Sequence, residues 1–95
     1  MAAQQAQSAA PESDVEFLGE LAQTFKDQVP SLYYRQHSWS AQSGQRFVVI
    51  NGESRREGDQ VASGVTLREI LRESSVLEYQ GTQFRLRALN SWVNL

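Results

Sequence analysis

The dipeptide Asn51-Gly52 restricts the fold of this chain more than any other feature of its sequence. It follows Phe47–Ile50, a run that is apolar at every position and therefore typical of a strand covered on both faces. Asn and Gly accept at low cost the positive φ that a type I′ turn requires, so the pair predicts a two-residue β-hairpin. We expect the return strand over residues 53–56, with Ile50 opposite Glu53. The middle of the chain is thus predicted to pair in antiparallel fashion.

Further turn signals divide the rest of the chain into short strands. Gly58-Asp59 is expected to end the return strand, and Gly64 to turn the chain into a strand over Val65–Leu71 whose apolar positions face inward. A last hairpin is predicted around Gln80-Gly81, with Leu77 opposite Phe84 and Tyr79 opposite Thr82 on one face. The residues predicted to shape the turns are Asn51, Gly52, Gly58, Asp59, Gly64 and Gly81.

The N-terminal part has a different pattern. Residues 1–12 are mostly Ala, Gln and Ser, a composition with too few apolar side chains to offset the entropy of ordering, and are interpreted as a linker. Ser13-Asp14-Val15-Glu16 fits a capping box, and apolar residues follow at helical spacing. We therefore expect a helix over about residues 14–28 that ends before Pro30. It either packs on its own domain or binds a partner or a second domain.

These elements predict a mainly β fold. The expected architecture is a small antiparallel β-sandwich or barrel-like domain of about five or six short strands, preceded by one N-terminal helix. The strands should occupy about residues 32–87, and a C-terminal tail residues 88–95. With 95 residues, the chain has room for one domain with a modest core, which we place at residues 13–95.

Composition excludes several classes of function. No apolar run reaches the roughly 18–20 residues of a membrane span, so we expect no membrane contact by this fragment. A net charge of -2 argues against nucleic-acid binding, and the absence of cysteine removes thiolate nucleophiles and cysteine-ligated zinc. The N-terminus lacks the pattern of a signal peptide. The chain is therefore expected to be cytosolic or to be a part of a longer protein.

No pattern points to catalysis, a metal or a cofactor. The single histidine, His37, precedes Ser38, but adjacent strand residues point to opposite faces and cannot form a local nucleophile and base pair. A structural or interface histidine is the favoured interpretation. The acids around Gly58 lack the alternating pattern of a calcium loop, and the glycines form no phosphate-binding motif. We therefore expect a non-enzyme.

Two groups of residues are candidates for binding a partner. The segment Leu32–Trp39 is the candidate edge strand, because aromatic side chains anchor interfaces and exposed edges accept strands from other chains. A core position is the alternative for its aromatic residues. A basic turn is the second candidate, and a solvated hairpin tip is the alternative for it. The candidate residues are Leu32, Tyr33, Tyr34, Arg35, His37 and Trp39 in the edge, and Arg55 and Arg56 in the turn.

The order of several short motifs resembles a known family. These motifs are VPSL at 29–32, HSWS at 37–40, RFVVING at 46–52, EGD at 57–59, GVTL at 64–67 and LEYQGTQFRL at 77–86. Together they are similar to the C-terminal periplasmic domain of the type II secretion protein B family, also called general secretion pathway protein B. The sequence departs from the family's usual pattern at Ser43-Gly44-Gln45, where a proline is common, and in the extension Leu89–Leu95, which contains Trp92.

The resemblance implies a binding function. It implies an inner-membrane protein with one transmembrane helix and a flexible periplasmic linker, whose terminal domain this chain would contain. It further implies docking on the N-terminal periplasmic domain of the secretin, the outer-membrane channel, in support of its assembly or function. Some relatives work with a partner ATPase that engages peptidoglycan. Two alternatives remain open: the homology region of the system's C component or a pilotin-like protein, and a peptidoglycan-binding accessory module.

Overall fold

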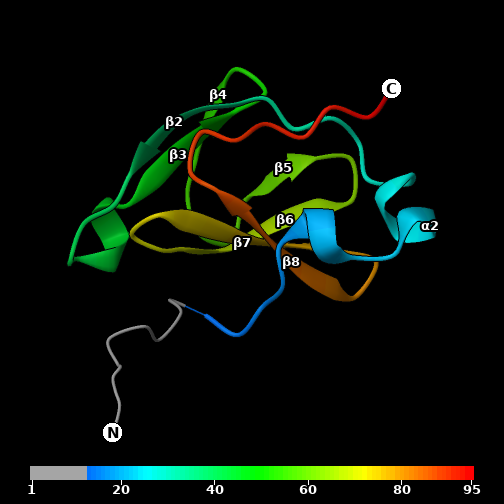
Figure 1. The fold of residues 1–95 in the computed structure, drawn as a ribbon. Helices are drawn as coiled ribbons and strands as arrows, with labels where there is room; N and C mark the ends of the chain where they lie inside the picture. The colour runs from blue at the N-terminus through cyan, green and yellow to red at the C-terminus, as the bar shows by residue number, and fades with distance from the viewer. Residues whose placement is uncertain (1–12) are drawn as a thin grey trace, which may run out of the picture.

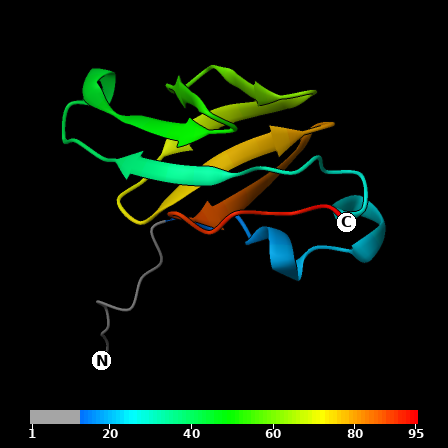
Figure 2. The same cartoon turned by 90° about the horizontal axis from the view of Figure 1, so that it is seen from above.

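The computed structural model describes residues 13–95 and contains two facing antiparallel sheets (Figures 1 and 2). The first sheet has the order β2-β3-β4 and the second the order β5-β6-β7-β8. The strands are β2 (Tyr34–Ser38), β3 (Phe47–Ile50), β4 (Glu53–Arg55), β5 (Gln60–Ala62), β6 (Val65–Ile70), β7 (Ser74–Tyr79) and β8 (Thr82–Arg87). The predicted fold class is confirmed, with seven strands in the described residues instead of five or six.

The hairpins form as the turn chemistry predicts. Asn51 and Gly52 have φ of 54° and 83°, and Ile50 pairs with Glu53. Gln80 and Gly81 also have positive φ. Leu77 then faces Phe84, and Tyr79 faces Thr82, in the register expected from the sequence. Gly58 and Gly64 occupy the two other predicted turns, again with positive φ.

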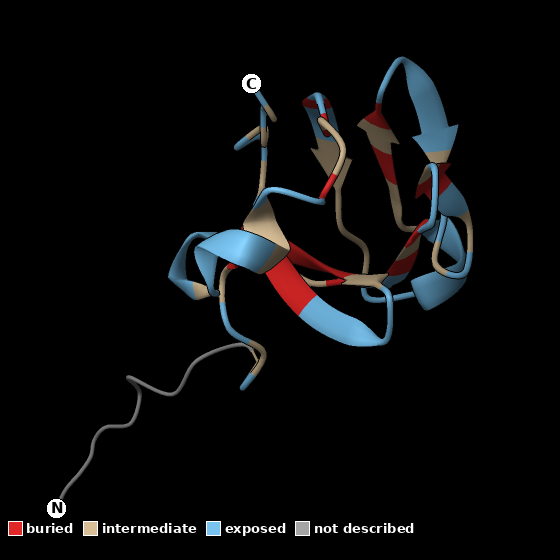
Figure 3. Ribbon diagram, turned by 90° about the vertical axis from the view of Figure 1, so that its right-hand side faces the viewer, coloured by how far each residue is buried: buried red, intermediate tan, exposed pale blue. Residues whose placement is uncertain are grey.

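The core lies between the two sheets (Figure 3). Inward positions of both sheets contribute to it, including Val48 and Ile50 from β3 and Leu67 from β6, all with no exposed surface. Burial of such side chains contributes roughly 1.5–3 kcal/mol each relative to exposure. Because one hydrophobic cluster joins the two sheets, the stability of residues 13–95 depends on the packing of both.

The predicted helix over residues 14–28 is wrong. The segment instead contains a short 3₁₀ helix, η1 (Leu18–Glu20), and one α-helical turn, α2 (Gln23–Lys26), with extended residues between them. α2 does end before Pro30, as expected. A second 3₁₀ helix, η2 (Ser43–Gln45), links β2 to β3.

Pairing with β8 explains why the helix does not form. Phe17 forms a parallel bridge with Arg85, and the Arg85 amide donates to the Glu16 carbonyl at 2.8 Å. The Ser13 hydroxyl accepts from the Val15 amide, two residues away, instead of capping a helix. Phe17 thus forms an isolated β-bridge beside β8, and this tertiary pairing overrides the local helical pattern at the start of the segment.

The N-terminal segment also buries Arg85. Its Nε donates to the Val15 carbonyl at 2.7 Å, and its guanidinium lies 4.1 Å from the centre of the Phe17 ring. Arg87 stacks on the same ring at 4.7 Å. The N-terminal segment therefore covers Arg85 on the outer side of β8, while Arg87 stays exposed.

A bulge in β2 brings Tyr34 and His37 to the same interior side. Pairing with β3 shifts between Tyr34 and Gln36, so residues three apart point inward together. The Tyr34 hydroxyl lies 2.5 Å from His37 Nδ1 and 2.6 Å from Ser75 Oγ. His37 Nε2 lies 2.7 Å from the Leu71 carbonyl, which only accepts, so Nε2 carries a proton. This network joins the two sheets.

Gly52→Ala should lower the free energy of unfolding by about 1–2 kcal/mol, because a Cβ is disfavoured at positive φ even though the space around Gly52 is open. Chemical denaturation measures the change. The matched control is Gly44→Ala in η2, where the space is equally open and φ is not positive. Equal losses in the two variants would contradict a type I′ requirement at Gly52.

The stability of the protein should fall as pH rises from about 10 to about 12. Burial raises the pKa of Tyr34 from 10.0 to about 12, although the bond to Ser75 opposes the shift. The unfolded chain therefore loses the Tyr34 proton first, and stability present below pH 10 is lost above it, by on the order of 2 kcal/mol. Denaturation across this range measures the loss. The Tyr34→Phe variant should have a lower free energy of unfolding below pH 10 but should lack this loss between pH 10 and 12. An equal fall of the free energy of unfolding in the two proteins would contradict the prediction.

Candidate interaction surface

The structure places Leu32 and Tyr34 in the core, so their prediction as partner contacts is wrong. Leu32 has no exposed surface and Tyr34 has 2%. The physical reason is that the C-terminal tail, residues 88–95, lies beside the segment that leads into β2 (Figures 1 and 2). Leu32 and Trp92 exchange two backbone hydrogen bonds of 2.7 and 3.0 Å. The start of the predicted edge is therefore not an open edge.

The tail is held to this edge by side chains as well. Ser91 Oγ accepts from the Tyr34 amide at 2.8 Å, and Trp92 Nε1 donates to the Val29 carbonyl at 3.2 Å. The Asn94 side chain donates to the Val29 carbonyl at 2.7 Å. Sequence reasoning left the place of Trp92 undecided; the only signal was a large aromatic residue in a C-terminal segment of mixed apolar and polar residues. Its half-buried ring packs against the core.

Two predicted residues of the β2 segment remain accessible. The Tyr33 side chain is 41% exposed, and the Arg35 guanidinium lies 5.8 Å from the centre of its ring. The backbone of Tyr33 is fixed by Asn51, whose amide donates to the Tyr33 carbonyl and whose Oδ1 accepts from the Tyr33 amide. Asn51 therefore shapes a turn and also anchors β2, a second role that its turn preference did not predict.

Trp39 lies between two arginines at the end of β2. The Arg72 and Arg46 guanidinium groups lie 4.2 and 4.9 Å from its ring. Arg46 also donates to the Ser40 carbonyl at 2.6 Å and pairs with Glu57 at 3.6 Å. The indole is partly buried against the core, so stacking holds it in one position. His37 lies nearby in sequence but points inward, as a structural residue.

Arg55 and Arg56 lie at the end of β4, away from the hairpin tip. Arg55 pairs with Glu53 at 2.9 Å, and a guanidinium nitrogen of Arg56 donates to the Gly44 carbonyl. The Arg56 amide donates to Asp59 Oδ2 at 2.8 Å, which closes the following turn. β3 separates these arginines from Tyr33 and Arg35. The two predicted groups therefore lie at opposite edges of one sheet and do not form one site.

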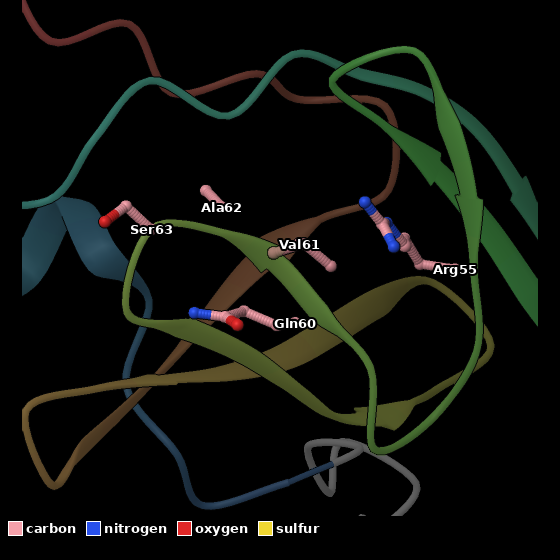
Figure 4. Close-up of a pocket in the computed structure, with 5 residues that line it drawn as sticks. All are labelled: Arg55, Gln60, Val61, Ala62 and Ser63. Carbon is pink, nitrogen blue, oxygen red and sulfur yellow. The ribbon is translucent and has the colours of Figure 1, made fainter.

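A hollow lies between β4 and β5 (Figure 4). Its lining residues are Arg55, Gln60, Val61, Ala62 and Ser63. In Figure 4 the Arg55 side chain extends from β4 toward β5. Sequence reasoning singled out Arg55 as part of a basic turn but did not identify β5 as the facing wall.

No constellation for metal binding appears in residues 13–95, where no three His, Asp or Glu side chains gather closely enough to hold an ion. No helix in the same range is long and apolar enough to cross a membrane. The arrangement offers arginines, partly exposed aromatic rings and strand edges, which are features of surfaces that bind other proteins.

Comparison with known proteins places these features in a family. The sequence profile of the family described as "Type II secretion system protein B" matches residues 29–88, more than half of the chain. A general secretion pathway protein B of Aeromonas hydrophila is 39% identical over 90 residues, which cover 95% of this chain and 38% of that protein. The protein of the same name from Klebsiella pneumoniae is 32% identical over 67 residues, covering 70% of this chain and 38% of that protein.

The fold agrees with a solved relative. The crystal structure of Dickeya dadantii GspB from the type 2 secretion system has a TM-score of 0.64 and 28% sequence identity, covering 67% of this chain and 76% of that one. These matches favour protein B over the C component or a pilotin-like protein. The chain spans less than two fifths of the length of the Aeromonas and Klebsiella relatives. The chain belongs to the type II secretion system protein B family, as the resemblance in its sequence indicated.

Proposed function

We propose that this chain is a non-catalytic, periplasmic protein-binding domain of a type II secretion system, and that it binds the N-terminal periplasmic domain of the secretin. Membership in the protein B family is the observation that carries the proposal. Binding there would assist the assembly or function of the secretin. The full protein would be anchored in the inner membrane by a segment outside this chain.

The surface of the domain supports protein binding. Six of the eight predicted contact residues are exposed or partly exposed: Tyr33, Arg35, His37, Trp39, Arg55 and Arg56. Arginine and aromatic residues are enriched at the centres of protein interfaces, because they combine a large contact area with directional polar groups. The small size of the domain is compatible with a standard interface of about 800 Å² per partner, or with a smaller and more transient one.

Titration of the isolated secretin N-terminal periplasmic domain, from the same organism, into this chain should give saturable binding by calorimetry. A flat titration with the partner at roughly millimolar concentration, where even weak complexes of about -4 kcal/mol form, would contradict the proposal. Pull-down with purified peptidoglycan, and titration with the periplasmic part of a peptidoglycan-engaging ATPase partner, are the parallel measurements. Binding in either of these alone would move the function to a cell-wall module or to another component of the machinery.

A further inference from the structure

The two sheets of this domain have four outer edges. The strand orders place β2 and β4 at the ends of the first sheet, and β5 and β8 at the ends of the second. A strand at such an end has unpaired backbone groups on one side, which another extended segment can join. The question is therefore which of the four edges is open to a partner.

The chain's own terminal segments bond to part of two of these edges. The tail bonds to the segment that begins β2, through the Leu32 and Trp92 backbones and through Ser91 Oγ on the Tyr34 amide. The N-terminal segment bonds to β8, through the Glu16 carbonyl on the Arg85 amide. A partner strand that joined the chain at these points would first have to displace these segments.

The edges of β4 and β5 are not occupied in this way. Within residues 13–95, β4 pairs only with β3 and β5 pairs only with β6. The two free edges lie on either side of the hollow in Figure 4. Val61 forms a nearly buried wall of this hollow, while Ser63 is exposed at its rim. An extended backbone entering here would meet an apolar surface and an unpaired strand edge together.

The charge of the hollow indicates what the entering segment carries. Arg55 is the only charged residue among those that line it. Arg55 Nε is buried and has no acceptor within the described residues, while Arg55 Nη2 pairs with Glu53 at 2.9 Å and the side chain as a whole is 29% exposed. Because Glu53 already accepts from Nη2 and Nε lacks an acceptor, a second acceptor in the hollow would satisfy Nε if the guanidinium turns toward it and is shared with Glu53. A carboxylate suits it best, since charge-assisted hydrogen bonds from a guanidinium are stronger than neutral ones.

We propose that the hollow between β4 and β5 receives an extended segment of the partner protein, which pairs with the edge of β5 and places an acidic side chain on Arg55. The inference rests on the proposed function for the partner, which is the secretin N-terminal periplasmic domain. It assigns binding to the β4 side of the first sheet, away from the Tyr33 and Arg35 group on the β2 side.

Titration of the unlabelled secretin domain into the isotope-labelled chain tests the location. The backbone amide shifts should be largest in residues 53–55 and 60–63. Arg55→Glu should weaken binding at least tenfold, whereas the matched reversal Arg35→Glu, at the opposite edge of the sheet, should change it less than twofold. Ser63→Glu adds a negative charge at an exposed rim position and keeps both Arg55 and Glu53, so it should also weaken binding. This variant tests the site even if Arg55→Glu proves poorly folded.

The outcomes separate the two proposals. Saturable shifts confined to residues 33–38, with binding lost in Arg35→Glu and kept in Arg55→Glu and Ser63→Glu, would overturn the β4–β5 site and leave the proposed function standing. Saturable binding that is equally strong in all three variants would also overturn the site. No shifts with the unmodified chain would overturn the proposed function, and the site with it.

Discussion

Backbone hydrogen bonds between the sheet edges and the chain's own terminal segments hold this domain in its observed arrangement. Leu32 can lie in the core because its amide and carbonyl are both bonded to Trp92. Leu18 follows Phe17, whose bridge with Arg85 of β8 places this segment beside the sheet, and Leu18 lies in the core. A buried backbone group without a partner costs about 1–3 kcal/mol, so the core positions and the edge bonds depend on each other.

Each of these edge bonds joins a residue inside the range of the family profile to a residue outside it. The family profile covers residues 29–88, whereas Phe17 lies before that range and Trp92 after it. The sheets and their hairpins lie inside the matched range. The two segments that contact the outer edges of β2 and β8 lie mostly outside the profile, although the match to the Aeromonas relative covers 95% of the chain, and they restrict where a partner strand can join.

Local chemistry made the hairpins predictable from sequence. Asn51-Gly52 and Gln80-Gly81 determine their turns through φ preferences, and once the turn is known the opposing pairs follow, as for Leu77 and Phe84. The predicted helix over residues 14–28 failed because its first residues bond to Arg85 in β8, a contact about 70 residues away that no local pattern reveals. The spacing of its apolar residues is compatible with one long helix and equally with short helical turns joined by extended residues.

The candidate site was predictable only in part, for a related reason. The type of residue pointed to Tyr33, Arg35 and Arg55, but strand alternation alone could not show that a bulge turns Tyr34 inward with His37. Nor could it show that the tail covers Leu32. The hollow beside Arg55 depends on how β4 and β5 face one another, which is a property of the packed sheets.

Native-state hydrogen exchange of the backbone amides tests the edge bonds most directly. If the terminal segments cover the edges, the amides of Leu32, Tyr34, Arg85 and Trp92 should exchange as slowly as those in the centres of β3 and β7. Protection at these four amides, far above that of the exposed turn at residues 52–53, is the predicted result. Exchange at Leu32, Trp92 and Arg85 as fast as in that turn would contradict the account, because it would show that the outer edges of β2 and β8 are open.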